Sequence, residues 1–90
     1  MTKAWQLVFT GQAIKQLKKL DISIQKKILD YLQEKVLKKS DPTVLGKALI
    51  GSKKGIWRYR TGNYRILCQI RTKEVMILVL DVGHRKNIYK

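Results

Sequence analysis

The sequence predicts an α+β fold of the order β-α-α-β-β-β, in which a helical hairpin packs on a mainly antiparallel four-stranded sheet. Three observations lead to this prediction. Apolar residues follow helical spacing twice in the first half of the chain. A short aromatic and β-branched stretch precedes these helices, and three strand-like stretches follow them. Because 90 residues suffice for one core, we expect residues 1–90 to form a single domain.

The first half predicts a strand followed by two helices. Ala4–Phe9 is short and rich in aromatic and β-branched residues, which is typical of a strand. Thr10 offers an N-cap hydroxyl to a helix over Gly11–Leu20. Asp21 can cap a second helix, which ends before Asp41. The apolar stripe of this second helix is Ile24, Ile28, Tyr31, Leu32 and Val36.

The second half predicts a loop and three consecutive antiparallel strands. Thr43–Lys54 has two glycines and no sustained period, which indicates a partly buried loop. Gly55–Arg60 and Tyr64–Arg71 alternate on either side of a turn at Thr61–Asn63. Val75–Val82 has apolar residues at both odd and even positions, which point to opposite faces of a strand. We therefore expect this strand to be covered on both faces and central in the sheet. Helices on one face leave the opposite sheet face available.

The chain is strongly basic, with 20 Lys and Arg against 6 Asp and Glu, a net charge of +14 and a pI near 10.2. Such a charge keeps a protein soluble, but its self-repulsion destabilises the folded state. We therefore favour a polyanionic partner. Nucleic acid ranks ahead of a membrane, because the chain has no long amphipathic cationic helix with an aromatic face. An acidic protein is the remaining alternative.

The sequence carries no sign of export or membrane insertion. The N-terminus lacks the long apolar stretch of a secretory signal, and no window approaches the roughly 18 apolar residues of a membrane span. The single cysteine, Cys68, cannot form an internal disulfide and is expected to fill the core. We expect a soluble cytoplasmic protein that contacts no membrane.

The arginines are concentrated in the last 33 residues, whereas the lysines are spread over the chain. They are Arg58, Arg60, Arg65, Arg71 and Arg85. The guanidinium group presents a rigid fork of donors that matches phosphate, so this half predicts the nucleic-acid surface. Strand alternation places Arg58 and Arg60 on one face, about 7 Å apart. They could instead pair with carboxylates, but only Glu74 and Asp81 are acidic after Asp41.

The helical lysines are more consistent with a solvated face than with a binding site. They include Lys26, Lys27, Lys35, Lys38 and Lys39. The only histidine, His84, lies in the polar segment Gly83–Lys90 and can carry a proton near neutral pH, although a lone histidine is structural at least as often as catalytic.

The inventory of side chains argues against metal and cofactor chemistry. One histidine, one cysteine and six scattered acids cannot readily form a zinc site, and the basic half lacks the clustered carboxylates of a two-metal nuclease. No phosphate-cradling P-loop signature is present. We expect no metal and no cofactor. A metal-free mechanism remains. RNA can be cleaved in this way, because its own 2′-hydroxyl can attack the adjacent phosphorus while arginines stabilise the developing charge.

The residues Trp57–Arg65 (WRYRTGNYR), Val82–Arg85 (VGHR) and Tyr89 resemble the RelE branch of the RelE/ParE toxin superfamily. The resemblance implies a RelE-like fold over the whole chain. It also implies the toxin of a type II toxin–antitoxin system, an endoribonuclease (mRNA interferase) that cleaves mRNA in the ribosomal A site by 2′-hydroxyl attack, without metal. The implied partners are mRNA, the ribosome with the 16S rRNA of its A site, and a cognate RelB-like antitoxin.

The resemblance also implies roles for individual residues. Arg65 would contact the reacting phosphate, Arg85 would stabilise the transition state, and Tyr89 would act as the general base. Arg58 takes the place of a lysine that the family carries in the strand before the turn.

The chain departs from the family pattern at two positions. Ile56 stands where a second strand lysine would lie, and His84 stands where a lysine can occur. Either Arg60 or Lys54 compensates, or His84 shares the acid–base work. The RNA-binding set is then Lys54, Arg58, Arg60 and Lys86.

Two other functions remain open on the same sequence. One is a ParE-like poison of DNA gyrase, which has the same fold and no catalysis of its own. The other is a non-catalytic RNA-binding module held by phosphate contacts. An antitoxin also has a physical motive, because a surface of this charge favours an acidic, partly disordered segment that folds on contact.

Overall fold

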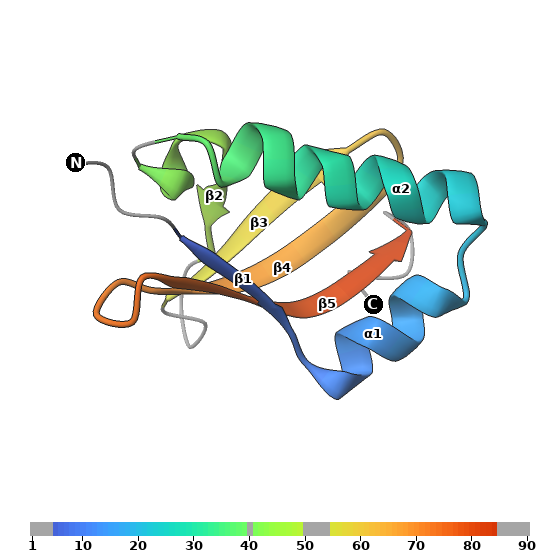
Figure 1. Cartoon of the computed structure of the whole chain (residues 1–90), viewed down its shortest axis with the longest axis horizontal. Coiled ribbons are helices and arrows are strands. Elements are labelled where there is room, and N and C mark those ends of the chain that lie inside the picture. Colours follow the sequence, from blue (N-terminus) through green and yellow to red (C-terminus); the bar gives the residue numbers. More distant parts are fainter. Residues whose placement is uncertain (1–4, 40, 50–54, 85–90) are drawn as a thin grey trace.

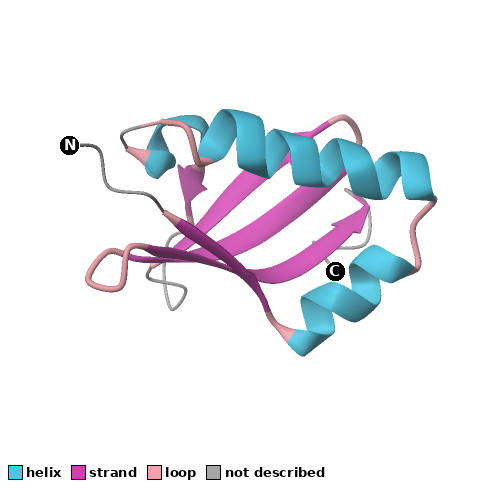
Figure 2. Cartoon of the chain, in the orientation of Figure 1, coloured by secondary structure: helices cyan, strands magenta, loops and turns pink. Residues whose placement is uncertain are grey.

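The structure, a computed structural model, describes residues 5–39, 41–49 and 55–84 (Figure 1). Two helices pack on a five-stranded sheet, which confirms the predicted α+β class (Figure 2). Across the sheet the strands are β1 (Gln6–Phe9), β5 (Met76–His84), β4 (Tyr64–Arg71), β3 (Ile56–Thr61) and β2 (Lys47–Ala48). β1 runs parallel to β5 and the other neighbours are antiparallel, so the sheet is mainly antiparallel as predicted.

Helix α1 (Gly11–Lys18) begins where the sequence predicts. The hydroxyl of Thr10 accepts a hydrogen bond from the backbone N–H of Ala13 at 3.1 Å, which satisfies one of the free donors at the helix N-terminus. The same hydroxyl donates to the carbonyl of Leu80 at 3.4 Å. Thr10 therefore joins the start of α1 to strand β5.

Helix α2 (Ile22–Asp30) crosses one face of the sheet (Figure 1). Asp21 stands at its N-cap as predicted, but the Asp21 side chain makes no capping hydrogen bond. The connection is held differently, because the Gln25 amide donates to the carbonyl of Leu20 at 2.8 Å.

α2 continues directly into a π-helical segment, η1 (Tyr31–Val36). The core residues Ile28, Leu32 and Val36 are fully buried and are spaced by four positions. In an α-helix such residues drift around the axis, because a turn takes only about 3.6 residues. The wider π turn reduces this drift and keeps the last two residues directed at the sheet.

The segment Thr43–Lys54, predicted as a loop, supplies a short fifth strand. Pro42–Leu45 forms a 3₁₀ turn, η2, and the Asp41 side chain caps it by accepting a backbone N–H two residues on, at 3.0 Å. Lys47–Ala48 then pairs with β3 as strand β2. The predicted count of four strands is therefore one too low, because two residues are too few for side-chain alternation to be recognised.

Strand β5 lies between β1 and β4, inside the sheet as its apolar run predicts. Its coverage on both faces is not observed, because Leu78 on the second face is only partly buried. Ile77 and Val79 fill the core, and a β-bulge then makes Val82 the next core residue. The apolar residues at both odd and even positions thus arise in part from this shift of register. In the sequence, a strand with a bulge and a strand buried on both faces show the same pattern.

The core lies between the helices and one face of the sheet. Tyr59 is fully buried, and its hydroxyl donates a hydrogen bond to the carbonyl of Pro42 at 2.6 Å. Burial raises the pKa of this hydroxyl. Cys68 is also fully buried and fills the core as predicted, and burial raises the pKa of its thiol to about 12.

Candidate nucleic-acid interface

Three arginines gather on the sheet face that is turned away from the core. Arg60 on β3 is the direct cross-strand partner of Arg65 on β4. Arg58 lies two positions before Arg60, so it shares the same face, as the sequence spacing predicts. The intervening Tyr59 points into the core. We call the face that carries Arg58, Arg60 and Arg65 the open face.

Two positive charges face each other in the Arg60–Arg65 pair. Like charges directly opposite each other destabilise a sheet, by an energy of the order of the ~0.2–1 kcal/mol that favourable cross-strand pairs contribute. Arg65 is only 8% exposed, so its charge is also largely withdrawn from water. Together with Arg58 on the same face, the pair presents guanidinium donors of the kind that match phosphate.

Lys47 extends the open face toward the edge of the sheet. It is the cross-strand partner of Arg58, so the two side chains lie on the same side. Leu45, Lys47, Arg58 and Arg60 line a shallow cavity of about 260 Å³. Sequence reasoning missed Lys47, and no periodic signal marks it, because strand β2 is only two residues long.

Arg71 lies on the open face but outside this cluster. It follows Arg65 by six strand residues, a separation of about 20 Å. Its guanidinium group forms an ion pair with Glu74 at 3.3 Å, and both side chains are about half exposed. Arg71 therefore belongs to the far end of the sheet and offers a control for the arginine cluster.

His84 lies on the opposite side of the sheet from the arginine cluster. It is the cross-strand partner of Tyr64, and the two rings meet edge to face, with 5.4 Å between the ring centroids and an interplanar angle of 80°. The β-bulge in β5 explains this placement, because it shifts the parity of every later residue in the strand. Gly83 instead is the partner of Arg65. The structure thus brings the cluster close to the end of β5, but it directs the His84 side chain away from it.

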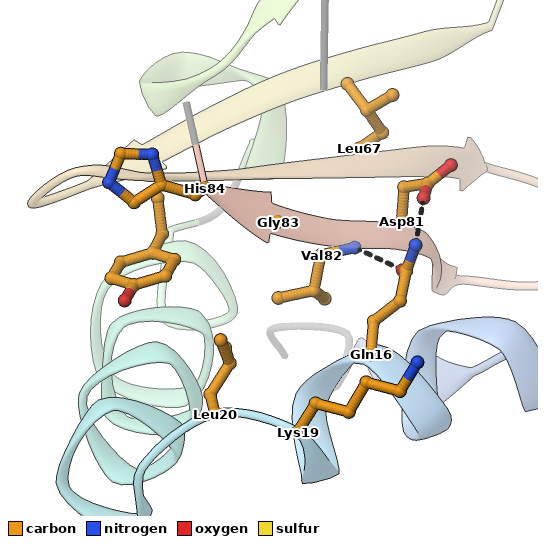
Figure 3. A pocket seen from close by; sticks show the side chains of 9 residues that line it. Gln16, Lys19, Leu20, Leu67, Asp81, Val82, Gly83 and His84 are labelled. Atoms are coloured by element: carbon orange, nitrogen blue, oxygen red, sulfur yellow. Dashed lines mark hydrogen bonds between the residues drawn. The ribbon is translucent and has the colours of Figure 1, made fainter. Parts of the chain in front are cut away.

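A cavity of about 390 Å³ lies between α1 and the C-terminal half of β5 (Figure 3). β1 pairs with β5 only as far as Val79, so α1 rather than a strand lies beside the remaining edge. Gln16 of α1 occupies this edge. Its side-chain carbonyl accepts the N–H of Val82 at 2.8 Å, and its amide donates to Asp81 Oδ1 at 2.7 Å. The Gln16 side chain therefore takes the place of a neighbouring strand.

Four of the predicted site residues lie outside the described residues: Lys54, Arg85, Lys86 and Tyr89. The transition-state role of Arg85 and the general-base role of Tyr89 stay predictions. The helical lysines that we predicted to form a solvated face are described, and all are exposed. One of them, Lys38, forms an ion pair with Glu34 at 3.1 Å.

Two negative findings apply to residues 5–39, 41–49 and 55–84 alone. Within these ranges no group of three or more His, Cys, Asp and Glu side chains is placed to hold a metal ion. The helices of the same ranges are all too short or too polar to cross a membrane.

Comparison with known proteins gives a family and a set of related structures. The family model described as ParE toxin of type II toxin–antitoxin system, parDE, matches residues 7–89. A chain of the toxin–antitoxin complex RelBE2 from Mycobacterium tuberculosis is 26% identical, with a TM-score of 0.83 over 92% of this chain and 100% of that chain. A mutant of the E. coli toxin RelE in the free state is 26% identical, with a TM-score of 0.73 over 91% of this chain and 84% of that chain.

A third structure agrees with these two. A chain of the RelB–RelE antitoxin–toxin complex from Methanococcus jannaschii is 26% identical, with a TM-score of 0.64 over 91% of this chain and 94% of that chain. Curated protein sequences gave no significant match. The family match spans almost the whole chain, and the matched structures share its fold. This chain therefore belongs to the ParE toxin family of type II toxin–antitoxin systems, and within the RelE/ParE superfamily it is a toxin of the RelE branch.

Proposed function

We propose that this toxin is a ribosome-dependent, metal-independent endoribonuclease that cleaves mRNA in the ribosomal A site. The observation that carries the proposal is the cluster of Arg58, Arg60 and Arg65 on adjacent strands of the open face. Side chains spaced in this way can hold neighbouring phosphates of one RNA strand. The likeness to RelE toxins supports the same function.

The proposed reaction uses the RNA as its own nucleophile. The 2′-oxygen attacks the adjacent phosphorus, the bond to the 5′-oxygen of the next nucleotide breaks, and a 2′,3′-cyclic phosphate forms. Tyr89 takes the proton from the 2′-hydroxyl, a role that a tyrosine can fill where positive charge favours the phenolate. Arg65 contacts the reacting phosphate, and Arg85 stabilises the charge that develops on the phosphoryl oxygens.

The remaining residues hold the strand and return the proton. In the proposed arrangement the RNA backbone is bound by Lys54, Arg58, Arg60 and Lys86. His84, at the end of β5, shares the acid–base work by protonating the departing 5′-oxygen. Because the His84 side chain is directed away from the open face, this role requires the RNA to pass around the end of β5.

We further propose a RelB-like antitoxin as the protein partner and the cytoplasm as the location. The structures from E. coli, Pyrococcus horikoshii and Methanococcus jannaschii are complexes of RelE with RelB. A chain of net charge +14 attracts an acidic segment, which would compete with RNA for the same cations. Co-purification of the toxin with a short acidic protein encoded beside it tests this partner.

Mapping RNA cut sites with and without ribosomes tests the enzyme proposal. We expect cuts in a translated message only when ribosomes are present, with 2′,3′-cyclic or 3′-phosphate ends. Arg65→Ala should reduce the cleavage rate by roughly 10²-fold or more, because it removes a charge-stabilising donor. Arg71→Ala is the matched control, since Arg71 lies at the far end of the same strand and pairs with Glu74.

One rival has an observation in its favour, because the matching family model is described as that of a ParE toxin. If the toxin gives no RNA cuts while a control interferase does, and DNA damage depends on gyrase, the ParE-like function replaces the proposal. Ribosome or RNA binding without new RNA ends would instead indicate a non-catalytic module.

A further inference from the structure

Two rows of cross-strand partners run across the open face to β5. In register they are Arg60, Arg65 and Gly83 in one row, and Lys47, Arg58, Leu67 and Asp81 in the other. The cations occupy the half of the rows that lies on β2, β3 and β4. The last residues of both rows, Gly83 and Asp81, line the cavity between α1 and β5 (Figure 3). Leu67, Asp81 and Gly83 line this cavity from the open face, whereas Val82, Tyr64 and His84 line it from the core side of the sheet. A base of an RNA strand whose phosphates lie on the cations therefore enters the cavity over the edge of β5.

The cavity has the shape and surface that a nucleobase needs. Its volume of about 390 Å³ falls within the range of roughly 300–1,000 Å³ typical of small-ligand sites. Leu20 and Val82 give it an apolar wall, and the rings of Tyr64 and His84 stand at one end. Figure 3 shows Gln16 at the opposite end. A flat base has apolar faces and a polar edge, which suits apolar and aromatic walls with polar groups at one side.

Asp81 is the group that can read the polar edge. Its Oδ1 accepts hydrogen bonds from the amides of Gln16 at 2.7 Å and Gln12 at 3.1 Å. No hydrogen bond from the described residues reaches Oδ2. A carboxylate repels phosphate, so its place at the end of a phosphate-binding row calls for a different ligand group. An exocyclic amino group of a base is the donor that a carboxylate accepts in nucleic-acid recognition.

We infer that this cavity is a nucleobase subsite, in which Asp81 Oδ2 accepts a hydrogen bond from the amino group of guanine, adenine or cytosine. Uracil has no amino group and is disfavoured. The inference rests on the proposed function, because it names what the RNA-cleaving surface recognises beside phosphate. Gln16 and Gln12 act as positioning residues, since they fix the carboxylate through Oδ1 and leave Oδ2 to the base.

Binding of non-cleavable RNA tests the inference without requiring catalysis. The probes are 2′-O-methyl oligouridylates that carry one central guanine, adenine, cytosine or uracil, and fluorescence anisotropy at fixed low ionic strength gives each Kd. Wild-type protein should bind the three amino-bearing probes about tenfold more tightly than the uracil probe, as one good base contact provides. Asp81→Asn keeps an oxygen for Gln16 but replaces Oδ2 by a donor. It should abolish or reverse the preference.

Glu74→Gln is the matched control, because it removes the same charge at the far end of the sheet. This variant should tighten all four probes equally and keep the tenfold preference. An equal affinity of the wild type for all four probes, or a preference that survives Asp81→Asn, overturns the inference and leaves the proposed cleavage intact. Loss of antitoxin binding in Asp81→Asn with unchanged RNA preference shows a protein-binding cavity instead. Failure to bind any probe also overturns the inference, whereas the proposed cleavage, which requires ribosomes, is tested separately by the mapping of RNA ends.

Discussion

Arg60 carries a positive charge that lies directly opposite another on the neighbouring strand. It stands opposite Arg65, which is only 8% exposed, and the two charges repel each other across adjacent strands. Stability and RNA binding are therefore expected to respond in opposite directions to a change of Arg60, because the repelling side chain is one that we propose for RNA binding.

Arg60→Gln should therefore stabilise the free protein while it weakens RNA binding. We expect the free energy of unfolding to rise by up to about 1 kcal/mol at low salt, which corresponds to roughly 4–8 °C in Tm for a domain of this size. Thermal unfolding followed by circular dichroism measures this change. Arg71→Gln is the control and should lie within about 0.5 kcal/mol of the wild type, because it loses only a surface ion pair. A Tm for Arg60→Gln at or below that of the control contradicts the repulsion.

Cys68 makes the stability of the fold depend on alkaline pH. Burial raises the pKa of its thiol to about 12, whereas an exposed cysteine titrates near about 8.5. The unfolded chain therefore loses this proton first as the pH rises. The stabilisation is complete below about pH 8.5 and is lost progressively from there toward pH 12, with a slope of at most ~1.4 kcal/mol per pH unit. Urea unfolding of the wild type and Cys68→Val between pH 8 and 11 should give a shallower decline for the variant. Equal declines would show that Cys68 does not titrate in this way.

At the scale of elements, the sequence predicted those parts whose pattern is local and long. Helices α1 and α2 and strands β1, β3, β4 and β5 each carry enough apolar residues to show a period. Strand β2 has two residues, and the π-helical η1 replaces α-helical geometry within an unbroken apolar stripe. Both depend on pairing or packing with distant residues. The spacing of apolar residues along the chain does not reveal such contacts.

The β-bulge in β5 had the largest consequence for the site. After Val79 it moves the next core position from Asp81 to Val82, and it turns His84 toward Tyr64. Simple alternation from Val79 would have placed His84 on the face of Arg65. A bulge depends on how a strand pairs with its neighbour, so the sequence of β5 alone does not reveal it. This explains why the shared face of Arg58 and Arg60 was predictable and the direction of the histidine was not.

Gly46, which joins η2 to β2, lies close to the buried ring of Tyr59. A Cβ atom at Gly46 would lie 2.9 and 3.0 Å from two ring carbons of Tyr59 and 3.3 Å from the carbonyl oxygen of Arg58. The Tyr59 ring is fully buried and its hydroxyl is bonded to Pro42, so it cannot easily move. Gly46→Ala should therefore lower the free energy of unfolding by about 1–3 kcal/mol.

The control for this junction is Gly11→Ala in the first turn of α1. Apart from the adjacent residues and the backbone of the helix itself, no described atom lies within 4 Å of a Cβ atom there, so the change adds helix propensity without a clash. It should leave the protein unchanged or stabilise it by up to about 1 kcal/mol. Urea unfolding of both variants provides the comparison. A Gly46→Ala protein as stable as Gly11→Ala would show that Gly46, just before β2, does not pack against Tyr59 as described.

At the scale of the whole molecule, the positive charge of the described residues is divided between two surfaces of different chemistry. Exposed lysines cover α1, α2 and η1, while arginines concentrate on the open face of the sheet. Both surfaces attract RNA from a distance, because long-range steering depends on net charge. Only side chains that displace counterions from bound phosphates contribute to the salt dependence of affinity. Salt dependence can therefore show which surface the RNA contacts.

Arg58→Gln should reduce the slope of log Kd against log salt concentration by about 0.7 for non-cleavable single-stranded RNA, the effect of one lost phosphate contact. Lys26→Gln removes the same charge from the exposed surface of α2 and should leave the slope nearly unchanged, with a small uniform loss of affinity. Anisotropy titrations from about 50 to 200 mM salt cover the useful range. If Lys26→Gln lowers the slope as much as Arg58→Gln does, the helical lysines contact RNA directly. The open face would then be only one part of a larger binding surface, and its arginines could no longer be assigned to RNA by their clustering.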